Sequence, residues 1–519
     1  GLFRQAYGTS GYLYPQPDVF STGWNLGFMY LPAYRAWVIA AAIIICAATW
    51  FIIEQTMLGA YLRAATEKPM LTRALGIRVP LLLTLTYGFG VGLAGLAGVM
   101  AAPIYQVNAL MGSHLMIVAF AIVVIGGVGS IKGAILAGFA LGVIEGLAKA
   151  FYAPLSTTIV FIVMALVLLI RPAGLFGSSG SSPQIESTTT SIVHSAARGR
   201  QELVVLWIAI ALFVVAPAFV YPPFVAKALC FALLAASVNL LIGYVGLFSF
   251  GHAAFFGFAS YATAFAAKNW GLGPELSILL GVGGAAILGT ATGIIAIRRQ
   301  GIYFAMVTLA LSQIVYYFVV QSPYAGSEDG IHSVPRGVFL GVLDLNDQIQ
   351  LYYFVLGIFV IGMLAIVRMI HSPFGRVLGA IRDNEVRAIS LGYSVDRFKL
   401  IVFVASATLA GLAGSTKAIA FQLASLADIH WFISGLAILM TIVGGVGTIA
   451  GPVVGAMLMI TVEEYFTDLG AWNFVIQGCI FIACVLLFRR GIVGEILNRV
   501  SVRRQVGTPA KAPETIEAH

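Results

Sequence analysis

Charged residues are scarce in this chain. Asp, Glu, Lys and Arg make up 10% of its 519 residues, whereas hydrophobic residues make up 60%, and the mean hydropathy is +0.96. Soluble domains carry about 25% charged residues. The composition therefore excludes a soluble globular protein, because such a protein could not bury this much apolar surface.

The usual marks of an enzyme are also missing. The four cysteines, Cys46, Cys230, Cys479 and Cys484, lie in apolar stretches without metal-ligand spacing, so we expect them to pack as small apolar residues. No Gly-Lys-Ser/Thr occurs, which a phosphate-binding loop needs. There is no recognisable catalytic triad. We expect no enzyme, no metal and no cofactor bound by this chain.

The apolar residues that dominate the chain fall in long runs. Stretches such as 36–53, 203–221, 351–370 and 474–488 have about the 17–25 residues that a helix needs to cross roughly 30 Å of hydrocarbon. A β-barrel would instead alternate with period two. We predict an all-α, polytopic transmembrane helical bundle, with roughly five spans in the first half and about eight to ten in the second.

The net charge of +8 comes from short Lys/Arg runs between the apolar stretches. A nucleic-acid surface would gather these charges on one basic face, so we expect no nucleic-acid partner. In membrane proteins such runs are typical of cytoplasmic loops. This places 63–78, 298–299, 376–399 and 489–504 on the cytoplasmic side.

The chain contains the same sequence twice. LAGLAG at 93–98 recurs identically at 409–414, an offset of 316 (409 − 93 = 316). At that offset Gly59 pairs with Gly375 and Gly76 with Gly392, and after a two-residue slip IGGVGSI at 125–131 matches VGGVGTI at 443–449. The copies run in the same direction with like-charged loops, so we predict two parallel homologous units with the same orientation.

The repeat divides the chain into expected domains. Only 58 residues precede Gly59, whereas about 170 residues of the second half, from residue 201, precede the Gly375 loop. We therefore expect residues 1–177 to form an N-terminally truncated first unit that lacks a counterpart of 239–257. A Ser/Gly-rich flexible cytoplasmic linker follows at 178–200, then the second unit at 201–500. The tail at 501–519 is expected to be disordered.

Two cytoplasmic loops are the clearest repeated feature. The segments 59–78 and 375–399 are amphipathic, carry charges at their tips and close with Leu-Gly, where the glycine can adopt the left-handed helix cap. A single such loop would be taken as an ordinary basic loop. Recurrence at equal spacing favours docking onto another protein.

Together with these loops, sequence motifs in both halves resemble those of the branched-chain amino acid permease family of bacterial ABC importers. The resemblance rests on LAGLAG, IGGVGSIKGA at 125–134, VGGVGTIAGP at 443–452, RPAGLFG at 171–177 and NLLIGYVGLFSFGHAAFFG at 239–257. It covers nearly the whole chain outside the linker and the tail. The first half resembles the C-terminal part of one permease subunit, and the second half resembles the complete other subunit.

The resemblance implies a multi-pass permease of the bacterial inner membrane. Its partners would be cytoplasmic ATPase subunits that hold ATP and Mg²⁺, a periplasmic or extracellular substrate-binding protein, membrane lipid and a small hydrophobic amino acid. It also implies that the loops contact the ATPases through Thr66, Glu67, Lys68, Gly76, Arg382, Asp383, Asn384, Glu385 and Gly392.

A candidate translocation path lies near 239–257. Polar side chains at membrane depth usually line an interior or a path, and glycines permit irregular backbone there. The candidates are Asn239, Ser249, Gly251 and His252. The alternative is that His252 only hydrogen-bonds a neighbouring helix.

Three alternatives for the function stay open. A permease of the same family could carry urea, short amides or other amino acids. An ion-coupled secondary transporter could relay protons through Glu145, Glu463 and Glu464. A membrane scaffold is disfavoured, because it would not need duplicated loops and glycine-broken helices.

Overall fold

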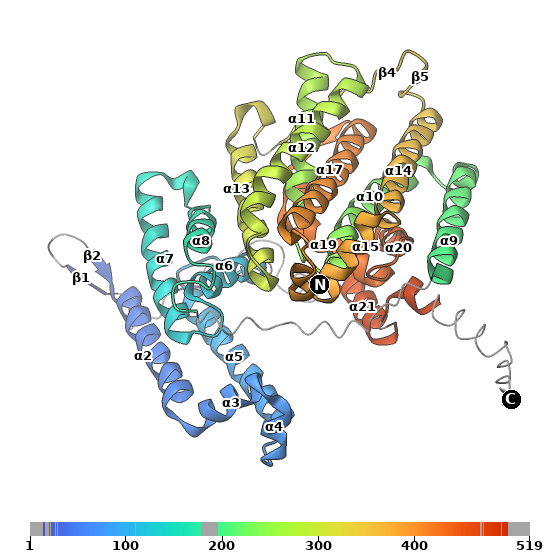
Figure 1. Cartoon of the computed structure of the whole chain (residues 1–519). Coiled ribbons are helices and arrows are strands. Elements are labelled where there is room, and N and C mark those ends of the chain that lie inside the picture. Colours follow the sequence, from blue (N-terminus) through green and yellow to red (C-terminus); the bar gives the residue numbers. More distant parts are fainter. Residues whose placement is uncertain are drawn as a thin grey trace, which may run out of the picture. The chain divides into compact units, whose positions relative to one another are not determined.

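The structure is a computed structural model (Figure 1). It describes residues 14–15, 20, 22–25, 27, 30–108, 111–156, 158–177, 196–327, 329–467, 470, 472–488 and 490–496. Residues 178–195 of the expected linker and the whole expected tail, 501–519, lie outside the described residues. Residues 196–200 form the first turn of a helix.

The described chain divides into two compact units. Unit 1 holds the described residues up to Val143 together with 174–177, and unit 2 holds Ile144–Ala173 and everything described from residue 196 onward. Residues 144–173 belong to unit 2 because α8 (Ile159–Ile170) packs on α13 (Gly301–Gln321). Arg299 Nη2 also donates to the Leu169 carbonyl oxygen at 2.7 Å.

Both units are built of helices, as the composition predicts. Unit 1 contains α2 (Ala33–Gln55), α3 (Met57–Glu67), α4 (Pro69–Ala74), α5 (Val79–Ala101), α6 (Met111–Gly126) and the start of α7 (Ile131–Phe151). Unit 2 adds α9 (Ala196–Val215), α10 (Pro222–Tyr244), α11 (His252–Asn269), α12 (Pro274–Ala296), α14 (Gln348–Ile370), α15 (Pro373–Asp383), α16 (Glu385–Ser390), α17 (Val395–Phe421), α18 (Leu426–Ile429), α19 (Trp431–Gly444), α20 (Gly451–Tyr465) and α21 (Trp472–Leu487).

Strands and short turns are minor in the described chain. Three antiparallel pairings occur: β1 (Gly23–Asn25) with β2 (Tyr30–Pro32), β3 (Ile331–His332) with β6 (Leu423–Ala424), and β4 (Val338–Phe339) with β5 (Leu343–Asp344). The single-turn 3₁₀ helices are η2 (Ala153–Leu155), η3 (Ala216–Ala218) and η4 (Pro323–Ala325). The all-α prediction is confirmed.

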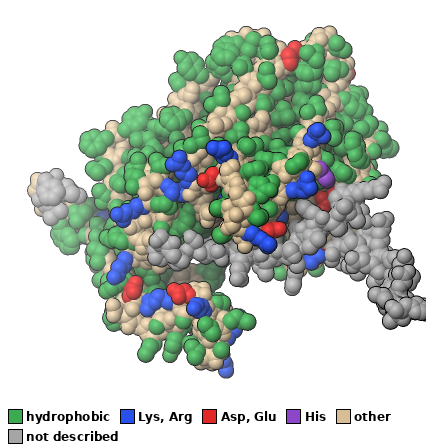
Figure 2. Space-filling model, in the orientation of Figure 1, with side chains coloured by type: hydrophobic (Ala, Val, Ile, Leu, Met, Phe, Trp, Pro, Cys, Tyr) green, Lys and Arg blue, Asp and Glu red, His purple; other side chains and the backbone are tan. Residues whose placement is uncertain are grey.

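Nine helices within the described residues are long and apolar enough to cross a membrane, and four shorter helices are apolar. Five of these thirteen lie before residue 178 and eight after it, in agreement with the expected numbers. Many of their apolar side chains are exposed, and Figure 2 shows hydrophobic side chains over most of the visible face. Such a surface suits lipid rather than water.

The duplication is visible in the boundaries of the helices. Adding 316 to the bounds of α3 and α4 gives the bounds of α15 and α16, and adding it to Val79 gives Val395, where α17 starts. Gly76 and Gly392 have φ of +84° and +88°, a conformation that glycine adopts without strain. We call 57–76 the first loop segment and 373–392 the second loop segment.

Unit 2 is organised around α10. Helices α11, α14, α17, α19 and α20 all pack against it, and nearly all of its residues from Val225 to Tyr244 are buried. The contacts between neighbouring helices use small residues, since close backbone approach drives association in lipid. An added Cβ at Gly414 of α17 would collide with the Phe256 carbonyl of α11.

The helix contact at Gly414 gives a test of this packing. We expect Gly414→Leu to lower the free energy of unfolding by about 1–3 kcal/mol, because the α11 backbone cannot yield to the larger side chain. Denaturant titration of the purified chain in detergent measures the change. The matched control is Gly98→Leu at the equivalent position of the first copy, where an added Cβ meets no atom within 4 Å. Equal losses in both variants would contradict the proposed packing.

Candidate functional site

The second loop segment is a pair of short helices with well-defined caps. Ser372 caps α15, its hydroxyl accepting from the Gly375 amide at 3.4 Å, and Pro373 follows at the first helical position, where its missing N–H costs nothing. Asn384 then separates the two helices and caps α16, accepting from the Arg387 amide at 2.8 Å. The fold of the segment is thus specified locally.

Two of the charged residues expected to contact an ATPase form contacts with the helix bundle of unit 2. Arg382 donates through Nη1 to the Gly243 carbonyl oxygen at the end of α10. Burial lowers the pKa of the Arg382 guanidinium, and the neighbouring Asp383 acts in the opposite direction. Glu385 accepts from Lys399 Nζ of α17 at 2.7 Å. These contacts fasten the segment to α10 and α17.

The outward face of the second loop segment is apolar. Val386 and Leu391 are 74% and 69% exposed, and Asp383 and Asn384 are exposed beside them. On the opposite side Ala388 is buried in a small cluster with Ile381 and Val395. The segment therefore presents three apolar side chains, those of Val386, Leu391 and Ile389, next to a polar hinge.

The first loop segment repeats this arrangement. Met70 and Leu75, which correspond to Val386 and Leu391 at the offset of 316, are 78% and 79% exposed. Thr72, which corresponds to Ala388, is buried. The predicted contact residues Thr66, Glu67, Lys68 and Gly76 are all exposed.

Asn239 of α10, a candidate path residue, holds a glycine-rich turn between α19 and α20. Its Nδ2 donates to the Thr448 carbonyl oxygen at 2.9 Å, and its Oδ1 accepts from the Gly447 amide at 2.9 Å. An added Cβ at Gly243, one turn further along, would collide with Gly447. The turn lies against α10 and uses the hydrogen-bonding groups of the Asn239 amide.

The other path candidates also lie in the interior of unit 2. Ser249 is buried and its hydroxyl accepts from the Gly251 amide at 3.2 Å. His252 Nε2 lies 2.8 Å from Ser406 Oγ, and Ser406 Oγ donates to the Ser237 carbonyl oxygen at 2.5 Å. His252 thus links α11 to α17 and, through Ser406, to α10. The proposal that these residues line a path stays a prediction.

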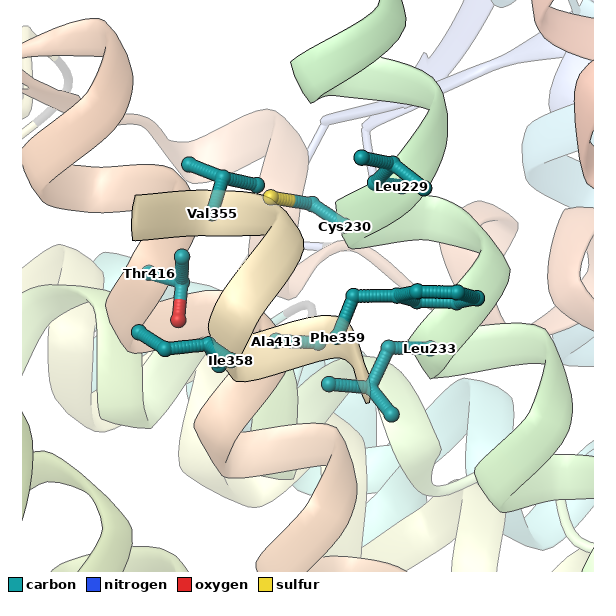
Figure 3. A pocket seen from close by; sticks show the side chains of 8 residues that line it. All are labelled: Leu229, Cys230, Leu233, Val355, Ile358, Phe359, Ala413 and Thr416. Atoms are coloured by element: carbon teal, nitrogen blue, oxygen red, sulfur yellow. The ribbon is translucent and has the colours of Figure 1, made fainter. Parts of the chain in front are cut away.

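The pocket that Figure 3 shows offers no substrate passage. It lies between α10, α14 and α17, has no room for a water molecule, and is lined by apolar side chains with one threonine: Leu229, Cys230, Leu233, Val355, Ile358, Phe359, Ala413 and Thr416. Among the described residues, no group of three His, Cys, Asp or Glu side chains could hold a metal ion.

The carboxylates weighed as a proton relay form ion pairs with lysines. Glu145 lies 2.6 Å from Lys149 Nζ, and Glu463 and Glu464 each lie 3.3 Å from Lys227 Nζ. Sequence reasoning missed two further lysines, Lys399 and Lys417, both inside α17. For Lys417 the available signal was an ionisable residue in the apolar part of a long helix.

The sequence pattern of the family described as "Branched-chain amino acid transport system / permease component" matches residues 12–168 and again 223–485. The high-affinity branched-chain amino acid transport system permease protein LivM of Escherichia coli K12 is 25% identical over 286 residues, covering 51% of this chain and 67% of that protein. LivH of Salmonella typhimurium is 35% identical over 136 residues, covering 26% and 43%.

A further relative, the L-arabinose ABC transporter permease protein AraH of Azospirillum brasilense, is 27% identical over 225 residues, covering 40% of this chain and 64% of that protein. No solved structure matches. The chain therefore spans about two thirds of LivM and AraH and less than half of LivH.

A substitution at Asn239 tests its structural role. We expect Asn239→Leu to lower the free energy of unfolding by about 2–4 kcal/mol, because it leaves the Gly447 amide and the Thr448 carbonyl buried without partners. Asn346→Leu, at an exposed asparagine in a loop, is the control, and we expect a change of about 0.5 kcal/mol or less. Unfolding of both variants in detergent is the measurement. Unchanged stability of Asn239→Leu would show that the turn does not need this side chain.

Proposed function

Because this chain belongs to the branched-chain amino acid transport permease family, we propose that it is the membrane-spanning component of an ATP-driven importer of hydrophobic, branched-chain amino acids. The observation that carries the proposal is the pair of loop segments, which share helix lengths, two buried positions (Ala65 and Ile381, Thr72 and Ala388) and two exposed apolar positions. Two equal segments suit two equivalent sites on a pair of ATPase subunits.

The apolar outward residues of the segments are the proposed ATPase contacts. Val386 and Leu391 in one segment, and Met70 and Leu75 in the other, are exposed on loops that the basic runs place in the cytoplasm. Exposed apolar side chains beside polar ones are typical of protein interfaces. Asp383, Asn384, Thr66, Glu67 and Lys68 would surround these contacts as a polar rim.

The inward contacts of the second loop segment would transmit movement. Arg382 joins the segment to α10, and Glu385 joins it to α17 through Lys399. α10 in turn holds the turn at 445–448 through Asn239. A displacement of the segment by closing ATPases would thus move α10 and α17 together, which alternating access requires. ATP and Mg²⁺ would be bound by the partner subunits.

The similarity to LivM and LivH, both named as branched-chain amino acid permeases, supports a branched-chain amino acid as the substrate. A permease for urea, amides or another amino acid is the sequence-based alternative within the family, and the similarity to AraH adds a sugar to these. An external substrate-binding protein would deliver the solute.

Introducing negative charge on the outward face of each loop segment tests the proposal that these faces dock onto the ATPases. We expect Val386→Glu combined with Leu391→Glu to reduce co-purification of the ATPase subunits at least about tenfold, because binding would bury two carboxylates without partners. Met70→Glu with Leu75→Glu is expected to act likewise. The control is Leu340→Glu with Val342→Glu, two exposed apolar residues near β4 and β5. Full association of the first two variants would refute docking through this face.

A substitution at Arg382 tests whether this residue transmits movement to α10 without taking part in ATPase docking. We expect Arg382→Met to retain ATPase association but to lower ATP-driven leucine uptake into vesicles about tenfold or more, because the link to the α10 carbonyl is lost while the outward face is intact. Arg376→Met, an arginine on the same helix, serves as the control. Loss of association in Arg382→Met would instead make Arg382 part of the docking surface, and unchanged uptake would exclude it from transmission.

A further inference from the structure

Unit 2 carries a buried ion pair far from the second loop segment. Lys417 Nζ of α17 lies 2.7 and 2.5 Å from the two carboxylate oxygens of Asp428 in α18. The side chains are only 13% and 6% exposed. Ionisable side chains at such depth are costly, and they mark functional sites more often than stabilising contacts.

The position of the pair along α17 places it toward the outer side. Lys399 and Lys417 are 18 residues apart (417 − 399 = 18) on one helix, which is about 27 Å at 1.5 Å per residue. That distance is close to the roughly 30 Å thickness of the hydrocarbon core. Because Lys399 binds the cytoplasmic loop segment, Lys417 lies in the outer half of the membrane.

The pair fastens a short irregular segment over the end of α17. Asp428 also accepts from the Ser425 amide at 3.2 Å, and β6 of this segment pairs with β3. Arg336 Nη2 donates to the Ala420 carbonyl oxygen at 2.8 Å, on the last turn of α17. Breaking the ion pair would loosen the link between α17 and α18, while the packing of α18 on α11 and the pairing of β3 with β6 keep the segment attached.

The helix that carries Lys417 does not need the pair in order to form. At the offset of 316, Lys417 corresponds to Ala101, although LAGLAG precedes both positions. No Asp or Glu occurs between residues 101 and 112 of the first copy, and α5 still forms there. The first copy thus forms the equivalent helix without the pair.

A partner for a ligand is present beside the pair. The Tyr261 hydroxyl of α11 is buried and has no hydrogen-bond partner among the described residues. Tyr261 packs in the cluster that contains Ile429, the neighbour of Asp428 in the chain. A buried hydroxyl without a partner is costly, and this cost would fall if a ligand accepted its hydrogen bond.

We propose that Lys417 and Asp428 form an outer latch that a zwitterionic amino acid opens. Its ammonium group replaces Lys417 at Asp428, and its carboxylate binds Lys417 with the Tyr261 hydroxyl donating to it. Separating the pair without replacement would leave two uncompensated buried charges. Only a solute that carries both charges compensates both, whereas urea, an amide or a sugar does not. This inference rests on the proposed function and specifies its substrate class.

The test measures ligand binding to the purified full chain in detergent, without a binding protein, by thermal stabilisation. The probes are L-leucine, L-leucinamide, 4-methylpentanoate, urea and L-arabinose. For the unmodified chain we expect half-saturation by leucine at a concentration at least tenfold below that of any other probe. Equal stabilisation by leucinamide, urea or arabinose, or no stabilisation by leucine, would overturn the proposal.

Variants identify the residues responsible. The double variant Lys417→Met with Asp428→Leu, called the neutral pair below, removes both charges without leaving one unpaired. We expect its leucine preference to disappear while its unfolding temperature without ligand is retained. Lys417→Asp with Asp428→Lys restores a pair in reverse and is expected to keep leucine binding within about threefold. The control is Lys149→Met with Glu145→Leu, which removes an exposed pair. Full leucine preference in the neutral pair would overturn the latch.

The same samples separate this proposal from the importer function. ATPase association and ATP-driven leucine uptake are measured in parallel on the unmodified chain and on the neutral pair. If the neutral pair takes up leucine at the rate of the unmodified chain, the latch proposal is refuted and the importer proposal is not affected. Absence of both ATPase association and leucine uptake in the unmodified chain would remove both. Retained association with at least tenfold slower uptake in the neutral pair is the expected result.

Discussion

The buried helix α10 is the constraint on which unit 2 depends. A membrane interior supplies no water to irregular backbone, so each exposed carbonyl or amide needs a protein partner. Asn239 supplies an acceptor and a donor to the turn at 445–448, and the Gly243 carbonyl at the end of α10 accepts from Arg382. The Ser237 carbonyl accepts from Ser406, which binds His252. Three separate parts of unit 2 are thus tied to one helix.

Much of the fold could be predicted from the sequence, because the offset of 316 carries over to helix boundaries. The bounds of α3 and α4 coincide with those of α15 and α16 at this offset, and Gly76 and Gly392 share a positive φ. The direction of the side chains could not be predicted. Arg382 contacts a carbonyl 139 residues away, and local sequence does not show such a partner. The apolar residues Val386 and Leu391 are also exposed, beside the polar Asp383 and Asn384.

The candidate translocation path shows a second limit of predicting function from residue type. Asn239 and His252 were selected because polar groups at depth are costly, and both side chains do form buried hydrogen bonds. A residue that ties helices and a residue that contacts substrate satisfy the same requirement, so sequence alone does not distinguish them. Lys417 differs, since its partner Asp428 is charged and lies on a short helix outside the long spans.

Helix α17 connects the features that the proposals invoke. Lys399 and Lys417 are 18 residues apart, five turns at 3.6 residues per turn, so they lie on the same face of the helix. Each forms an ion pair with a short helix, Glu385 at the beginning of α16 and Asp428 in α18. A continuous 27-residue helix shifts as a unit, because its packed backbone resists stretching. In the proposed mechanism, a displacement of the second loop segment through Glu385 therefore also acts on the Lys417–Asp428 pair, and a solute that weakens that pair lowers the resistance to the displacement.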